Sequence, residues 1–196
     1  MIAFIHGALV SKQPTEVWID CGGVGYALRI SLFTYGKIPD KGNIKLFTHL
    51  QIREDAHTLY GFHGIPERDL FRKLISVSGV GANTALVILS SMVPDEIVGV
   101  IQNSDVDRLK MVKGIGAKTA ERIIVDLKDK LGDTLVNEGE MPNFAGSYNT
   151  VRNEALTALD VLGFSRKSSE KVVAKIVQSQ PEISLEDLVK EAIKKM

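Results

Sequence analysis

A short motif that occurs twice constrains the fold of this chain more than any other feature. The two copies read Ser78-Gly79-Val80-Gly81-Ala82-Asn83-Thr84-Ala85 and Lys113-Gly114-Ile115-Gly116-Ala117-Lys118-Thr119-Ala120. Leu74 and Leu109 occupy matching positions upstream of the first glycines, and so do Val77 and Val112. Agreement beyond the glycines indicates an internal duplication.

Each copy predicts a tight turn between two helices. Glycines on both sides of an apolar residue suit positive φ or a close approach to the backbone, which glycine tolerates best. We expect Val80 and Ile115 to anchor the two turns. The helix that starts at such a turn has free backbone N–H groups, which can bind a phosphate without reading a base. For either copy alone, an ordinary helix-to-helix turn with glycine caps is the alternative.

The second copy carries the stronger predicted phosphate site. Lys118 and Arg122 lie one turn apart near the start of the predicted helix, where both can reach a phosphate. The alternative is a solvated face on which they pair with Glu121 or Asp126. The predicted DNA-binding residues of both copies are Gly79, Val80, Gly81, Ala82, Asn83, Gly114, Ile115, Gly116, Ala117, Lys118, Thr119 and Arg122.

The charge balance limits how such a chain can bind nucleic acid. It has 24 basic and 24 acidic residues and no net charge, whereas a nucleic-acid-binding domain usually carries a basic patch. Any DNA binding must therefore come from local geometry and from several copies acting together. The sequence has no apolar run of about 18 residues and no secretory leader, so we expect no membrane span and a cytoplasmic location.

The chain predicts a multi-domain α+β protein. Residues 1–64 indicate a small barrel and residues 65–132 one all-α domain of about five helices, with Pro66 in its first turn. Residues 133–150 are typical of a flexible linker, and residues 151–196 predict three helices. The β-rich stretches of the barrel are 1–10, 16–20, 24–31, 43–53 and 58–62.

The boundaries of the last region depend on short signals. Gly163 is expected to end its first helix and Pro181 to follow its second. Ser184, with Asp187 three residues later, predicts a capping box at the start of its third. A small domain joined by a linker usually recruits a partner.

Catalytic and metal-binding patterns are weak throughout. The run from Gly116 to Thr119 resembles a Walker loop only superficially, because it lacks a glycine directly before the lysine. Four histidines and the single Cys21 show no metal-ligand spacing. We therefore predict no catalytic residue, no metal and no cofactor. Glu54 and Asp55 fall in a predicted hairpin tip, which is normally a solvated turn; a metal site there is the alternative, and it lacks further acidic ligands.

These features together resemble a known family over the whole chain. The resemblance is to the bacterial RuvA family of Holliday-junction proteins. It is carried in order by Gly22-Gly23-Val24-Gly25-Tyr26, Arg53-Glu54-Asp55-Ala56, Leu59-Tyr60-Gly61-Phe62, the two glycine motifs with Thr119-Ala120-Glu121-Arg122, and Ala158-Leu159-Asp160-Val161-Leu162-Gly163-Phe164. It implies an OB-fold barrel, a double helix-hairpin-helix domain and a mobile, UBA-like three-helix domain. It also implies a homotetramer or octamer on four-way junction DNA.

The family resemblance assigns roles that spacing does not. It implies that Glu54 and Asp55 form an acidic pin, which repels phosphates and separates strands at the centre of the assembly. The C-terminal domain would recruit the hexameric ATPase RuvB, which uses ATP, and the resolvase RuvC would join the wider complex. The residues expected to contact the motor are Leu159, Leu162, Gly163 and Phe164. The implied processes are recombination, DNA repair and the SOS response to DNA damage.

Two positions depart from the family pattern. Members commonly have basic residues where this chain has Asn83 and Ala117, so contacts there are weaker or come from neighbours such as Lys113. The leading hypothesis is a non-enzymatic subunit that recognises junctions and loads a motor. A repair glycosylase or nuclease that grips DNA with its hairpins is the second hypothesis, and a protein-interaction scaffold is the third.

Overall fold

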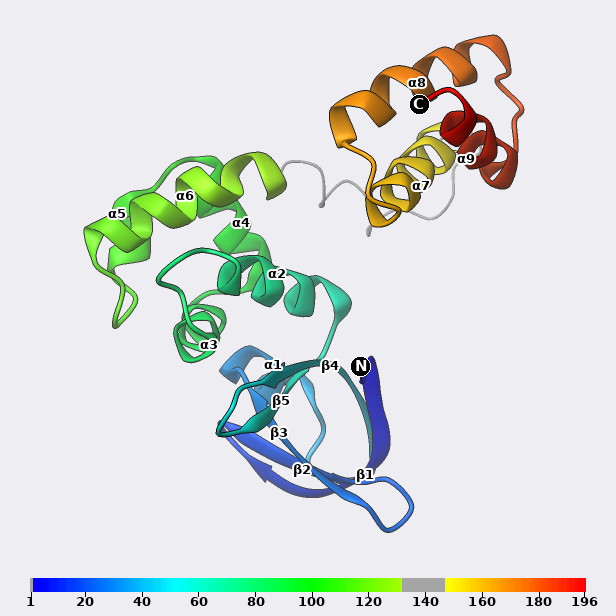
Figure 1. Ribbon diagram of the computed structural model, residues 1–196. Coiled ribbons are helices and arrows are strands. Elements are labelled where there is room, and N and C mark those ends of the chain that lie inside the picture. The colour runs from blue at the N-terminus through cyan, green and yellow to red at the C-terminus, as the bar shows by residue number, and fades with distance from the viewer. Residues whose placement is uncertain (1, 132–146) are drawn as a thin grey trace. The chain divides into compact units, whose positions relative to one another are not determined.

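The structure, a computed structural model, describes residues 2–131 and 147–196. The two described ranges belong to two separate structural units. The first unit holds a β-barrel and a run of helices, and the second holds three helices (Figure 1).

Five strands close the barrel, with neighbours in the order β1-β2-β3-β5-β4. All pairs are antiparallel except β3 with β5. This confirms the small barrel that the sequence predicted, and it is the OB-fold that the family resemblance implied. The strands are β1 (Phe4–Gln13), β2 (Glu16–Asp20), β3 (Gly25–Ile30), β4 (Asn43–Ile52) and β5 (His57–Phe62). The first strand lies later than the predicted 1–10, because Lys12 and Gln13 still pair with β2.

Buried and exposed side chains alternate along the strands, and the buried ones fill the barrel. Val17 and Ile19 on β2 are fully buried, and Trp18 between them is exposed. On β3, Leu28 and Ile30 point into the same core, which places Arg29 on the outer surface. The barrel therefore has its own apolar core, separate from that of the helices that follow.

A short helix, α1 (Leu32–Lys37), lies between β3 and β4 and was not predicted. Its phenylalanine, threonine and tyrosine favour strands over helices, so propensity gives no helix signal. Ser31 caps it, because the hydroxyl accepts the N–H of Thr34 at 3.0 Å. Thr34 is itself buried against the second region, so tertiary packing stabilises this turn.

Five helices follow the barrel, as predicted, and share one apolar core. They are α2 (Ile65–Ile75), α3 (Ala82–Ser91), α4 (Pro94–Gln102), α5 (Val106–Lys110) and α6 (Ala117–Leu131). Pro66 lies in the first turn of α2, where its missing N–H leaves no bond unmade. No single helix among the described residues is long and apolar enough to cross a membrane; α3 and α4 meet that criterion only as a pair bent by 100°.

The barrel and the helices meet through α2. The ring centroid of Phe71 lies 5.0 Å from that of Tyr60 and 4.9 Å from that of Phe62, both on β5, and the rings are tilted relative to one another. Such aromatic pairs contribute about 0.5–1.5 kcal/mol each beyond the area that they bury. The helical core therefore extends onto the last strand, and Tyr60 and Phe62 belong to it.

A buried carboxylate adds a polar link at this junction. Glu67 on α2 accepts hydrogen bonds from the hydroxyls of Ser31 and Thr34, the latter at 2.6 Å. It also accepts the backbone N–H of His63 at 3.2 Å. Burial raises the pKa of Glu67, and these hydrogen bonds oppose that rise. The three donors join the barrel to the first helix of the next region.

The second unit contains α7 (Ser147–Val161), α8 (Arg166–Ser179) and α9 (Leu185–Lys194). The start of α7 corrects the predicted linker of 133–150, whose last four residues, 147–150, are helical; residues 133–146 lie outside the described ranges. The predicted cap at Ser184 is confirmed, since its hydroxyl accepts the N–H of Asp187.

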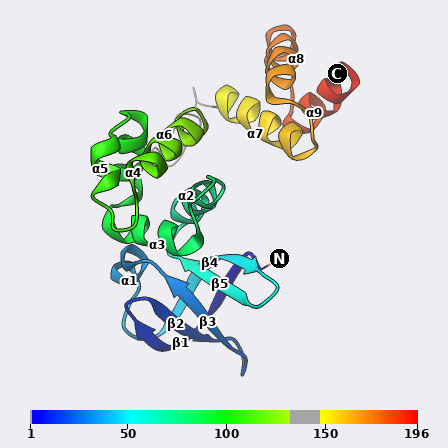
Figure 2. The ribbon, with the colours of Figure 1, turned by 60° about the vertical axis from the view of Figure 1, so that its left-hand side comes forward.

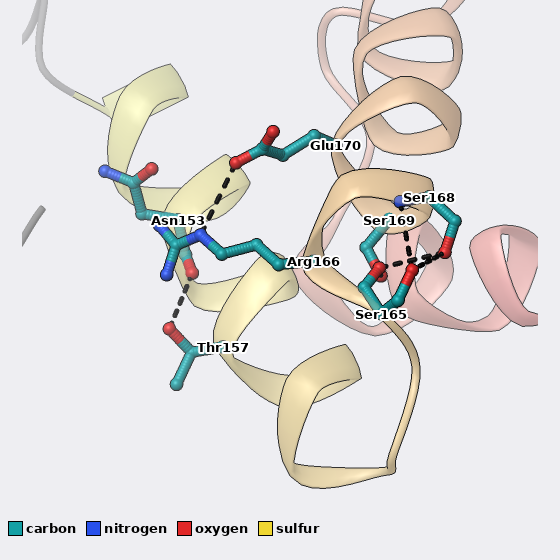
Figure 3. A network of polar contacts seen from close by, with 7 residues as sticks. All are labelled: Asn153, Thr157, Ser165, Arg166, Ser168, Ser169 and Glu170. Atoms are coloured by element: carbon teal, nitrogen blue, oxygen red, sulfur yellow. Dashed lines mark hydrogen bonds and ion pairs between the residues drawn. The ribbon is translucent and has the colours of Figure 1, made fainter. Parts of the chain in front are cut away.

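Polar caps also fix the start of α8. The Ser165 hydroxyl accepts the N–H of Ser168 at 3.4 Å, and the Ser169 hydroxyl donates to the Ser165 carbonyl at 3.1 Å (Figure 3). Arg166 pairs with Glu170 one turn along the same helix. These local bonds begin α8 directly after the glycine turn that ends α7.

Candidate nucleic-acid interface

The two glycine motifs have the same backbone geometry. Gly79 and Gly114 both have φ of +90°, a backbone conformation that residues other than glycine rarely adopt. The N–H of Val80 donates to the carbonyl of Val77 at 3.0 Å, and the N–H of Ile115 donates to that of Val112 at 3.1 Å. The duplication in the sequence is therefore a duplication in structure.

The apolar residue between the glycines anchors each turn, as predicted. Val80 is 4% exposed and Ile115 is 6% exposed, and both belong to the helical core. Leu74 and Leu109, the matching upstream residues, are fully buried in the same core. Both hairpins therefore pack on one apolar core, which fixes their positions relative to each other.

The second glycine of each motif leads into a helix. Gly81 is the N-cap of α3 and provides no side-chain cap, so the first-turn N–H groups have no side-chain acceptor. The first helical bonds run from Ala85 to Gly81 at 2.9 Å and from Ala120 to Gly116 at 3.0 Å. A Cβ built on Gly81 or Gly116 would meet no atom within 4 Å. The space in front of these glycines is open to a ligand.

The other predicted binding residues differ in accessibility. Ala82 is buried and Thr119 is half-buried, so they support their turns, whereas Ala117 and Lys118 are exposed. Among the described residues, no ion pair joins Lys118 or Arg122 to Glu121 or Asp126. The solvated pairing considered as an alternative is therefore not seen.

Arg122 connects the two hairpins, a contact that spacing did not predict. Its Nη1 donates to the carbonyl of Ser78 at 3.2 Å. Ser78 directly precedes the first glycine of the other motif. The side chain is exposed, and the bond to Ser78 uses one of the five N–H donors of its guanidinium. Arg122 therefore holds the hairpins together while its charge stays near both.

Asn83 has a partner from the barrel, which the sequence also did not reveal. Nη1 of Arg29 donates to Oδ1 of Asn83 at 3.4 Å. At the other end of α3, the Ser90 hydroxyl accepts the N–H of Leu32 at 3.0 Å. The alternation of inward and outward side chains along β3 places Arg29 on the outer surface of the barrel, but no pattern in the nearby sequence indicates which helix it contacts.

The acidic tip lies in the loop that joins β4 to β5 (Figure 2). The N–H of Arg53 donates to the carbonyl of Ala56 at 2.9 Å and closes the turn. Glu54 and Asp55 are exposed and form no ion pair with another described residue. Within residues 2–131 and 147–196, no cluster of three or more histidine, cysteine or acidic side chains could hold a metal ion.

Comparison with known proteins identifies the family. Residues 1–61 match the family model "RuvA N terminal domain", residues 71–129 match "SAM-like Helix-hairpin-helix tandem" and residues 150–196 match "RuvA, C-terminal domain". A protein of Flavobacterium psychrophilum is 51% identical over the full length of both chains, and one of Christiangramia forsetii is 48% identical over the same span. The chain belongs to the RuvA family.

A third RuvA relative, from Cytophaga hutchinsonii, is 46% identical and covers 99% of both chains. All three carry the name "Holliday junction branch migration complex subunit RuvA". The similarity to these RuvA proteins therefore spans the barrel, both hairpins and the C-terminal helices of this chain.

The C-terminal unit of this RuvA-family chain presents fewer of the predicted contact residues than expected. Leu159 is fully buried and Phe164 packs against the same core, so both stabilise the unit itself. This corrects the expectation that Leu159 contacts a partner directly. Gly163 has φ of +91° and ends α7. Leu162, 57% exposed, remains accessible, and Val161, which the sequence analysis missed, is 82% exposed.

Proposed function

We propose that this chain is the DNA-binding subunit of a branch-migration complex and recognises four-way Holliday junctions. The observation that carries the proposal is the pair of hairpins with equal backbone geometry, each with an open approach to the start of a helix. Such sites bind phosphates without reading bases. The printed name of the full-length relatives supports the same function and does not favour a repair glycosylase or nuclease.

The acidic tip is the second feature that would contribute to junction recognition. Glu54 and Asp55 extend from the barrel with exposed carboxylates. Two like charges about 6 Å apart in water repel by only about 0.7 kcal/mol. Their role is therefore to guide strands at the crossover, because repulsion of this size cannot drive migration.

The driving energy would come from a separate ATPase motor. The sequence contains no Walker loop, so we propose a non-catalytic chain that loads the motor and uses no cofactor of its own. The second structural unit, with exposed Val161 and Leu162, would make the contact. Because DNA is the ligand, the bacterial cytoplasm is the expected location.

Assembly would offset the absence of net charge. Several copies, as a homotetramer or octamer, place many modest phosphate sites on the arms of one junction, and linked sites gain avidity without new contacts. Mass measurement of the protein, alone and with junction DNA, tests this. A particle that stays monomeric on the junction would contradict the assembly.

A gel-shift titration tests the function itself. The protein is titrated against a four-way junction and against a linear duplex of one arm sequence, at one stated salt concentration. We expect clearly tighter binding to the junction, and equal affinity for the two would refute the proposal. A chain that ends before Ser147 should keep this preference but lose stimulation of the motor's ATPase; persistent stimulation would show that the second unit is not the contact.

A further inference from the structure

Arg29 lies where the barrel meets the first hairpin. It stands on the outer face of β3, between the buried Leu28 and Ile30. Its guanidinium donates to the amide oxygen of Asn83, in the first turn of α3. An arginine of the barrel therefore reaches the helix start that the first glycine motif creates.

In this position the guanidinium of Arg29 is hydrogen-bonded to an amide and not to a carboxylate. The amide oxygen that it contacts is neutral, and no ion pair joins Arg29 to an acid among the described residues. Glu16 lies opposite on β2, but its carboxylate forms no ion pair with Arg29 and accepts the indole N–H of Trp18 at 2.7 Å. A guanidinium has five N–H donors, and the bond to Asn83 uses one of them.

The docking of α3 fixes where this charge lies. Asn83 in its first turn contacts β3, and Ser90 in its last turn accepts the N–H of Leu32 at the start of α1. The helix lies beside α1 at the barrel in both ribbon views (Figures 1 and 2). The guanidinium is thus held beside the helix start by contacts at both ends of α3.

The duplicated motif shows what this charge replaces. Asn83 and Lys118 hold the same position in the two copies, so the second hairpin has its own cation and the first has a neutral amide. We propose that Arg29 supplies the positive charge of the first hairpin and binds the DNA phosphate held at the start of α3. This inference rests on the proposed function, because the ligand is the backbone of the same junction DNA.

Salt dependence of junction binding tests the inference. Each phosphate contact contributes about 0.9 to the slope of log affinity against log salt. Arg29→Ala should lower the slope by about 0.9 for each copy engaged and weaken binding several-fold at low salt. Lys41→Ala is the matched control, because it removes a charge from an exposed loop of the same barrel and should leave the slope unchanged.

A second variant separates charge from structure. Adding Asn83→Lys to Arg29→Ala returns a cation to the hairpin and should restore the slope. A wild-type slope for Arg29→Ala, or an equal loss in Lys41→Ala, overturns the inference. Failure of Asn83→Lys to restore the slope overturns the assignment to the first hairpin. Titration of the wild-type protein against the junction and against a linear duplex tests the proposed function separately, since that function fails only if the wild type does not prefer the junction.

Discussion

The two glycines of the second hairpin should respond differently to the same substitution. Gly114 has φ of +90°, whereas Gly116 is not among the residues with positive φ. A Cβ would have no neighbour within 4 Å at either position, so packing costs nothing in either case. Alanine at 114 must instead adopt left-handed backbone, which costs about 1–2 kcal/mol. Alanine at 116 meets no such strain.

The expected changes in stability follow from these terms. For a chain of this size, about 2–4 °C of melting temperature corresponds to 1 kcal/mol. Gly114→Ala should therefore lower the melting temperature by roughly 2–8 °C. For Gly116→Ala, a less favourable residue before the helix costs about 1 kcal/mol, and the lower entropy of the unfolded chain returns about 0.4–1 kcal/mol. The melting temperature of Gly116→Ala should stay close to that of the wild type.

DNA binding should be sensitive to the substitution at Gly116, although stability is not. The methyl group of Gly116→Ala occupies the open space through which a phosphate reaches the N–H groups of α6. Loss of one hydrogen bond to a charged group costs about 1.5–3 kcal/mol, or roughly 10- to 150-fold in affinity at each site. Gly116→Ala should therefore bind the junction more weakly than Lys118→Ala, whose exposed side chain makes a screened contact.

Gel-shift titration and thermal unfolding of the same preparations check both parts. Gly99→Ala in α4 is the control, because its Cβ also meets no atom within 4 Å and the residue lies away from both turns. It should keep wild-type binding and unfold at the same or a higher temperature. Wild-type affinity in Gly116→Ala would refute the close approach of a phosphate, and wild-type stability in Gly114→Ala would refute the backbone argument.

Three further predictions concern the contacts between elements. Arg122→Ala should weaken junction binding more than Lys118→Ala, because it also releases the Ser78 carbonyl; a smaller loss in the gel shift would contradict this. Glu67→Ala should lower the free energy of unfolding in denaturant by about 3 kcal/mol, since buried donors lose their acceptor, and Glu67→Gln should cost less. Burial, aided by the charge of Arg72, lowers the pKa of His49 below the usual 6.5, so the unfolded chain binds more protons than the folded one. The melting temperature should therefore fall as the pH drops below 6.5. A profile of melting temperature against pH that is flat and identical to that of His49→Phe would refute this.

Glu67 contributes with the opposite sign, which matters when the pH profile is interpreted. Burial raises the pKa of Glu67 above its usual 4.5, so the folded chain binds the proton more tightly. This contribution favours the folded state as the pH falls toward 4.5 and is lost as the pH rises through the folded pKa. The His49 effect is therefore isolated by comparing His49→Phe with the wild type at each pH, not from the wild-type profile alone.

Short-range preferences in the sequence account for most of the secondary structure of this protein. Glycine at positive φ, apolar periodicity and capping serines act within a few residues, so the two hairpins, the five strands and most helix positions could be predicted. The short helix α1 was the exception. Its residues favour strands, and it depends on the contact of buried Thr34 with Glu67.

Contacts between side chains that are distant in the sequence depend on how the strands and helices pack. Arg29 reaches Asn83 because α3 docks on the barrel by both ends, and Arg122 reaches Ser78 because both hairpins rest on one core. The burial of Leu159 likewise depends on how three helices close around it. Packing sets these distances through many weak contacts at once, and no spacing within the sequence encodes them.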